Sequence, residues 1–152
     1  MPRMVSAQCI RLIFPELPFF RVALPPGSAP TGADLDIFVF DPSGNLAGSS
    51  TKSGTDEQVN IRFPADGTWT VYIHGWAAPG GVSDYNLYNW SLSAAPDGGL
   101  KITGAPKKAV LSETATIRVD WVGAGNQWYL GAVSHTGPKG MIGLTLIDVD
   151  NR

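Results

Sequence analysis

The feature that most constrains this chain is a two-residue alternation of apolar and polar side chains in short segments between turns. Every second residue is apolar in residues 58–63 (Val59, Ile61, Phe63) and in residues 68–75 (Trp69, Val71, Ile73). This period places all the apolar side chains on one face of an extended strand. No stretch keeps a 3.6-residue period for the length of a typical helix, so we expect half-buried strands and almost no helix.

Further strand-like segments either alternate or, like residues 19–24, are mainly apolar, and they are separated by turn residues, as in Asp41-Pro42-Ser43-Gly44. They are residues 19–24, 34–40, 84–94, 100–104, 114–122, 128–134 and 141–149. The 18 glycines and 12 prolines also favour short strands joined by turns. The sequence therefore predicts an all-β fold, an antiparallel β-sandwich followed by a second small β module.

A change in composition divides the chain. Residues 94–99 read Ala-Ala-Pro-Asp-Gly-Gly and have no apolar face, which is typical of a linker. We therefore expect one β-sandwich at residues 17–95, a linker at 96–98 and a second module at 99–152. Arg3 and some apolar residues give the first segment a weak likeness to a signal peptide, but Gln8 and Arg11 interrupt it, so residues 1–16 are left unassigned.

Charge and cysteine content exclude several classes of function. The net charge is −2 and the longest basic run is Lys107-Lys108, so we expect no nucleic-acid partner. Cys9 is the one cysteine, so the chain can form neither an internal disulfide nor a thiolate metal site. No apolar run approaches the roughly 18 residues that a membrane span needs, so we expect no membrane span.

The alternating faces predict the core of the first module. Trp69, Val71 and Ile73 share one face of their strand, and Leu35, Ile37 and Val39 share one face of theirs. We expect these two faces to meet in a single core. Most aromatic residues are expected to be buried there, as aromatic residues usually are.

Two carboxylates on one strand face form a candidate metal site. Asp34 and Asp36 lie two residues apart, which is about 6–7 Å along a strand. A hard cation such as Ca²⁺ would neutralise them, and Asp56 and Glu57 could add oxygen ligands if their loop folds back. The alternative is that these carboxylates are solvated or accept hydrogen bonds from backbone N–H groups. No cofactor other than calcium is indicated.

Three aromatic residues are candidates for a binding surface. Tyr72 and Trp76 lie on or beyond the polar face of their strand, and Tyr88 could join them across strands. Aromatic side chains bury a large area with little loss of entropy, so an exposed group of them can stack on a sugar or hold a peptide. Of the two histidines, His74 is expected at a strand end and His135 in a hairpin turn, and neither has a nucleophile motif beside it.

The segments DLDIFVFDPSGN (34–45), GTDEQV (54–59) and GTWTVYIHG (67–75) occur in an order that resembles the bacterial pre-peptidase C-terminal domain. That family is a small, jelly-roll-like β-sandwich that follows the catalytic domain of secreted peptidases, and some collagenase relatives bind calcium through acidic residues. The segments TATIRVDW (114–121), WYLGAV (128–133) and IGLTLIDV (142–149) resemble the Ig-like segment that closes many subtilisin-like peptidases.

The resemblance implies a non-catalytic accessory region of a secreted bacterial subtilisin-like peptidase, which assists substrate docking, secretion or stability. Its expected partners are a peptidase catalytic domain in the same polypeptide or a protein substrate. Two alternatives stay open: a β-sandwich that binds carbohydrate or protein on its own, and a free-standing enzyme. The sequence offers no catalytic triad for the enzyme.

Overall fold

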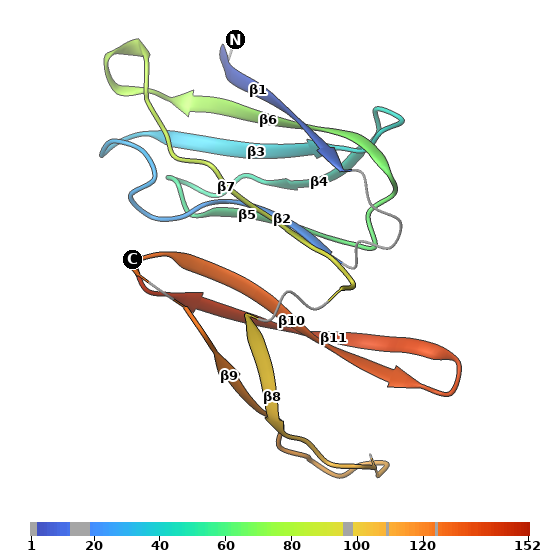
Figure 1. Ribbon diagram of the computed structural model, residues 1–152. Helices are drawn as coiled ribbons and strands as arrows, with labels where there is room; N and C mark the ends of the chain where they lie inside the picture. Colours follow the sequence, from blue (N-terminus) through green and yellow to red (C-terminus); the bar gives the residue numbers. More distant parts are fainter. Residues whose placement is uncertain (1–2, 13–18, 96–98, 109, 124) are drawn as a thin grey trace. The chain divides into compact units, whose positions relative to one another are not determined.

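The computed structural model describes residues 3–12, 19–95, 99–108, 110–123 and 125–152 (Figure 1). The chain divides into two compact units, residues 1–94 and 95–152. Most of the described chain is strand, and helical structure within it is limited to one 3-10 turn, η1 (Pro79–Gly81). The predicted all-β, antiparallel fold class is confirmed.

Two antiparallel sheets form the first unit (Figure 1). The first sheet has the order β1 (Arg3–Leu12), β6 (Gly67–Ala77), β3 (Asp34–Phe40) and β4 (Leu46–Ser50). The second sheet has the order β5 (Glu57–Arg62), β2 (Phe19–Leu24) and β7 (Tyr88–Leu92). Strands β2 and β3 have the bounds that the sequence predicts, whereas β7 is shorter than the predicted segment 84–94.

The core of this unit contains side chains from both sheets, which makes it a β-sandwich. Trp69, Val71 and Ile73 of β6 pack with the inward side chains of β3, and the predicted core face is confirmed. The second sheet contributes its own buried residues, and the inward side chains of β3 complete the set: Phe20, Val22, Leu24 and Val59, with Leu35, Ile37 and Val39.

Strand β1 lies within the segment that the sequence analysis leaves unassigned. It pairs antiparallel with β6, from Leu12 opposite Gly67 to Arg3 opposite Gly75, with one irregularity between Met4 and Ser6. In the sequence, Val5, Ala7 and Cys9 alternate with Ser6 and Gln8. This two-residue period indicates a strand, which was missed because the segment was compared only with a signal peptide. The rest of that segment and the predicted linker 96–98 lie outside the described residues.

The second unit contains two antiparallel strand pairs. One pair is β8 (Leu100–Gly104) with β9 (Arg118–Trp121), and the other is β10 (Trp128–Gly137) with β11 (Gly140–Asp150). Strand β8 has its predicted bounds, while β9 occupies only the C-terminal half of the predicted segment 114–122. Among the described residues of this unit, Val133 is the one large apolar side chain that is buried.

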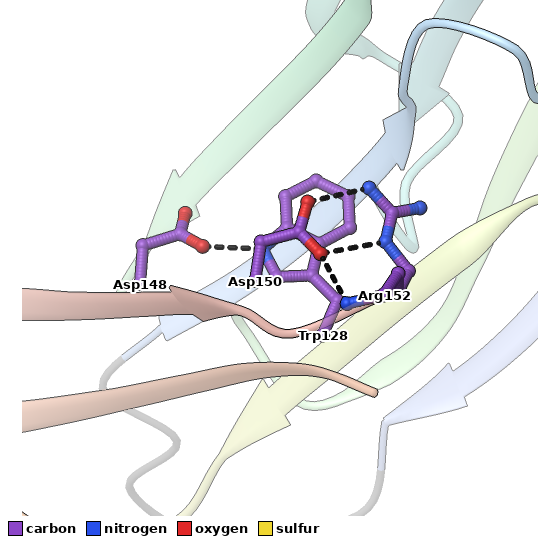
Figure 2. A network of polar contacts seen from close by, with 4 residues as sticks. All are labelled: Trp128, Asp148, Asp150 and Arg152. Carbon is purple, nitrogen blue, oxygen red and sulfur yellow. Dashed lines mark hydrogen bonds and ion pairs between the residues drawn. The ribbon is translucent and has the colours of Figure 1, made fainter. Parts of the chain in front are cut away.

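A polar cluster closes the open end of the β10–β11 hairpin (Figure 2). Trp128 stands opposite Asp150 in the pairing, and its indole Nε1 donates to Asp148 Oδ1. Two nitrogens of the Arg152 guanidinium donate hydrogen bonds to Asp150: Nε to Oδ1 at 2.9 Å and Nη2 to Oδ2 at 2.7 Å. The same guanidinium lies 4.7 Å from the centre of the Trp128 ring, within the range of a cation–π contact.

This cluster predicts a pH dependence at the hairpin end. The hydrogen bonds from the Arg152 side chain lower the pKa of Asp150 from 3.8 to about 2. Because the pKa in the folded hairpin is the lower one, the ionised carboxylate stabilises the folded end above about pH 3.8. That contribution is lost as the pH falls from 3.8 to about 2. We expect Trp128 fluorescence and the Asp150 carboxyl NMR signal to titrate together with a midpoint near the lower value.

Asp150→Asn is the control, because it keeps the shape of the side chain and removes the titrating group. This variant should show no such midpoint. Added salt should raise the midpoint in the unmodified chain, because the pair is exposed and therefore screened. A midpoint at the ordinary aspartate value in low salt would contradict the assignment.

Candidate functional site: an aromatic groove on the first sheet

The outer face of the first sheet carries aromatic residues because of the same alternation that builds the core. In β3 and β6 the residues between the core positions must point the other way. The pairing register then sets Asp36 opposite His74, Phe38 opposite Tyr72 and Phe40 opposite Thr70. Paired residues of antiparallel strands share a face, so β3 and β6 together build one outer surface.

This surface contains a groove of about 480 Å³. Its lining residues come from β3, β6 and the turn after β3: Phe38, Phe40, Gly44, Thr70, Tyr72 and His74. The volume lies within the roughly 300–1,000 Å³ of typical ligand sites, which are also mostly apolar with a few polar groups. The groove therefore has the size and the chemistry of a binding site.

The rings that line the groove meet edge to face. The Phe40 and Tyr72 ring centres are 5.4 Å apart with planes at 84°, and those of Phe38 and His74 are 6.3 Å apart at 73°. This is a favourable geometry for aromatic pairs, because the positive edge of one ring meets the negative face of the other. Such contacts hold the groove walls in place.

An ion-pair geometry marks one end of the groove. His74 Nδ1 lies 3.1 Å from Asp36 Oδ2, and the two side chains are 18% and 13% exposed. The carboxylate fixes the orientation of the imidazole and leaves Nε2 as the ring nitrogen that can bond a ligand. Trp76 extends the surface beyond His74, with ring centres 6.3 Å apart, and is 67% exposed. We call Phe38, Phe40, Tyr72, His74 and Trp76 the aromatic strip.

The turn between β3 and β4 supplies the wall at Gly44. The Asp41 carboxylate accepts hydrogen bonds from the backbone N–H groups of Ser43 and Asn45, both at 2.9 Å. The backbone N–H of Asn45 contributes most to lowering the pKa of Asp41, followed by the Asn45 side chain, and the Ser43 N–H adds to the effect. Gly44 has φ of +82°, a conformation that favours glycine, as the sequence predicts for this turn.

Of the predicted binding residues, Tyr72 and Trp76 are on the aromatic strip and Tyr88 is not. Tyr88 belongs to β7 in the second sheet, where its ring stacks on Trp90 at 6.1 Å and 17°. The expectation that Tyr88 joins the other two across strands is therefore wrong. The sequence could not reveal this, because strand alternation fixes a face and not the sheet to which a strand belongs.

Phe38 and Phe40 are groove residues that the sequence analysis did not single out. A signal for them was present, since Phe38 lies between the predicted core residues Ile37 and Val39, and Phe40 directly follows Val39, so both are on the opposite face of the strand. An apolar residue at a solvent-facing strand position is a departure from the usual alternation and can mark a binding surface. His74 was expected at a strand end but lies inside β6, where its ring is hydrogen-bonded to Asp36. His135 was expected in a hairpin turn but lies within β10, opposite Gly143.

Two of the four predicted metal-binding carboxylates hold the loop between β4 and β5. Asp34 Oδ1 accepts the backbone N–H of Gly54 at 3.0 Å, and Glu57 Oε1 accepts that of Lys52 at 2.5 Å. Glu57 is 1% exposed, and its Oε2 has no hydrogen-bond partner among the residues that the structure describes. Asp34 and Glu57 therefore follow the alternative to metal binding, in which the carboxylates accept hydrogen bonds from backbone N–H groups.

The other two carboxylates have other partners. Asp36 is bonded to His74, and Asp56 lies 3.3 Å from Lys52 Nζ on the surface. Within the described part of the chain, no group of three or more acidic, histidine or cysteine side chains is placed to hold a metal ion. The four carboxylates have separate partners, so calcium binding at these residues would require their contacts to rearrange.

Thermal melting tests calcium directly. A calcium site at Asp34 and Asp36 requires millimolar calcium to raise the Tm above its value in chelator, by mass action on the folded state. Asp36→Asn must then lose that gain, because it removes a charge and keeps the shape. From the contacts described above we expect equal Tm values for the unmodified chain in calcium and in chelator. A rise that Asp36→Asn abolishes would show that the carboxylates rearrange around the ion.

Comparison with protein families identifies the segment that carries the groove. Residues 21–75 match the family model described as the bacterial pre-peptidase C-terminal domain. The matched segment runs from β2 into β6 and includes the groove residues of both β3 and β6. This match supports the resemblance of the segment to the pre-peptidase C-terminal domain. Among the described residues, no helix is long and apolar enough to cross a membrane.

Proposed function

We propose that this chain is a non-catalytic accessory region of a secreted bacterial subtilisin-like peptidase, and that its aromatic strip docks protein substrate. Domains of the matched family are typical of the C-terminal regions of secreted peptidases. The Ig-like likeness of residues 99–152 supports the same assignment. Under this proposal the chain acts outside the cell, beside a catalytic domain in the same polypeptide.

The observation that carries the proposal is the groove between β3 and β6. Its aromatic rings are tilted against one another at 84° and 73°, so they form an uneven apolar surface and not a flat platform. Such a surface suits apolar side chains of a peptide, and Tyr72, His74 and Thr70 can add hydrogen bonds to its backbone. An unfolded or fibrous protein presents both groups along an exposed chain.

An accessory role also agrees with the chemistry beside the groove. Asp36 and His74 reproduce the acid–histidine half of a serine-peptidase triad, which needs a nucleophile next to the imidazole. The groove residues are Phe, Gly, Thr, Tyr and His, and the lining formed by the described residues includes neither serine nor cysteine. We therefore assign the pair to the positioning of the His74 ring and not to catalysis.

Carbohydrate binding is the second candidate, and one observation favours it. Trp76 is 67% exposed and lies beside the polar Asp36–His74 pair. An exposed indole face next to hydrogen-bonding groups can stack on a sugar ring. In that case Trp76, and not the groove behind it, would dominate binding.

Capture on insoluble material separates the two candidates. The purified full chain is mixed with insoluble collagen or immobilised casein, and in parallel with insoluble polysaccharides. We expect retention on protein and none on polysaccharide. Retention on polysaccharide that Trp76→Ala removes would support the second candidate, and hydrolysis of casein by the isolated chain would contradict the non-catalytic role.

A further inference from the structure

Strand β9 leaves one edge of its strand pair open. Its partner is β8, with Trp121 opposite Leu100 and Val119 opposite Ile102. No described residue pairs with the other edge of β9. Exposed strand edges are templates for pairing with another chain, and a two-stranded pair is marginally stable without further cover.

The hydrogen-bond pattern defines which groups the open edge offers. The backbone N–H of Val122 donates to Gly99 O at 3.1 Å, toward β8. Since successive residues of a strand direct their N–H and C=O groups to opposite sides, those of Val119 and Trp121 point away from β8. A two-fold axis at Val119 would therefore set two Val119 residues opposite each other as a hydrogen-bonded pair.

The side chains of residues 117–121, Ile-Arg-Val-Asp-Trp, are complementary to themselves in this antiparallel register. Arg118 stands opposite Asp120 of the second copy, and Asp120 opposite Arg118, which gives two cross-strand charge pairs on one face. On the other face Ile117 stands opposite Trp121, and Val119 opposite itself. Opposite charges and apolar–aromatic neighbours are both favourable cross-strand pairs.

The surroundings of β9 extend this match. Lys101 of β8 stands opposite Asp120, so the register places Asp120 between Lys101 and the second copy's Arg118. Trp121 is 49% exposed and Val122 is 85% exposed, which leaves apolar area for a second copy to cover. The open edge of β8 is not complementary to itself in this way, because self-pairing about Ile102 would set Lys101 opposite Thr103 and not opposite an acidic residue.

We propose that the chain forms a two-fold symmetric dimer through β9, with antiparallel pairing centred on Val119. The partner is a second copy of this chain, since the five-residue segment supplies both halves of every contact, as an isologous interface requires. The contact area is small, so the dimer is weak and concentration-dependent. It is independent of the proposed substrate docking, which uses a different unit of the chain.

Charge exchange at β9 tests this dimer. Arg118→Asp sets aspartate opposite Asp120, and Asp120→Arg sets arginine opposite Arg118, so each variant alone has two repulsive pairs. We expect sedimentation velocity of the full chain, at concentrations up to about 1 mM, to show a dimer whose Kd either change raises about tenfold or more. Mixing the two variants restores both pairs, and we expect the mixture to form a heterodimer.

Two further outcomes decide the case. Val119→Pro removes a backbone N–H that points to the open edge and leaves the bonds to β8 intact, so it should abolish the dimer while the circular dichroism spectrum stays unchanged. If one variant alone is less stable, heterodimer formation in the mixture still tests the charge pairing. A chain that stays monomeric over the whole concentration range, or variants that fail to associate when mixed although both are folded, would overturn the proposal.

Discussion

Replacing Trp69 with alanine is expected to destabilise the first unit by about 3–5 kcal/mol, the cost of removing a large aromatic side chain from a core. Trp69 is 3% exposed and its ring centre lies 6.3 Å from that of Phe20 in the opposite sheet. Its indole N–H also donates to Ala65 O at 2.9 Å. Since typical domains are stable by about 5–15 kcal/mol, Trp69→Ala should lose much of the stability of this unit.

The matched control lies on the same strand. Trp76 is 67% exposed, so Trp76→Ala removes an equal volume without opening a core cavity and should cost less than about 1 kcal/mol. Urea unfolding of the two variants, followed by circular dichroism, measures both values. Equal losses for Trp69→Ala and Trp76→Ala would show that the inner and outer faces of β6 are assigned wrongly.

Gly48→Ala is expected to cost about 1–3 kcal/mol, the usual penalty for overpacking a core. Gly48 lies in the edge strand β4, where a Cβ would come within 2.7 Å of Val59 Cγ1 on the opposite sheet. Val59 is buried, and its branched side chain has little freedom to rotate away. Glycine at this position therefore allows β4 to approach β5 closely.

A double-mutant cycle separates this contact from other effects of the substitution. In the Val59→Ala background the obstructing methyl group is absent, so adding Gly48→Ala should cost almost nothing or recover some stability. The free energies of unfolding of the four proteins give the coupling between the two positions. A Gly48→Ala penalty that is the same in both backgrounds would show that backbone strain, and not contact with Val59, requires the glycine.

The sequence predicts strands from two signals. Alternation places β3 and the inward faces of β3 and β6, because the period of a half-buried strand is visible without knowledge of its neighbours. Strand β2 is instead a mainly apolar run that is buried at every position, and it is recognised by the prolines that follow it. Strand β4, Leu46–Ser50, is not visible in this way, since it is short and consists mainly of small residues. Its position depends on pairing with β3, which is a tertiary contact.

The candidate site is predictable to a smaller extent for the same reason. Alternation places Tyr72 on the outer face, but the groove depends on the register of β3 against β6, which sets Phe38 opposite Tyr72. The acidic residues show a second limit. The spacing of Asp34 and Asp36 is the same whether they bind an ion or, as here, Gly54 N–H and His74. Only the folded loop distinguishes the two.

The two proposals would reinforce each other on a fibrous or immobilised substrate. A dimer through β9 carries two aromatic grooves, so one bound groove would raise the local concentration of the other and slow release. Affinity for a single groove is therefore best measured on the Asp120→Arg variant, in which the β9 pairing is disfavoured. Retention on insoluble protein should decrease in that variant while its affinity for a soluble peptide stays unchanged.

The central claim, that the groove between β3 and β6 docks protein, is tested most directly by titrating the Asp120→Arg chain with soluble peptides from digested casein or collagen. Tyr72→Ala in this background removes the wall that meets Phe40 at 5.4 Å. We predict at least about a tenfold loss of affinity for Tyr72→Ala, as for a central binding residue. Phe63→Ala, which removes an exposed aromatic residue outside the groove, should bind as before. Equal affinities for the chains with and without Tyr72 would contradict the account.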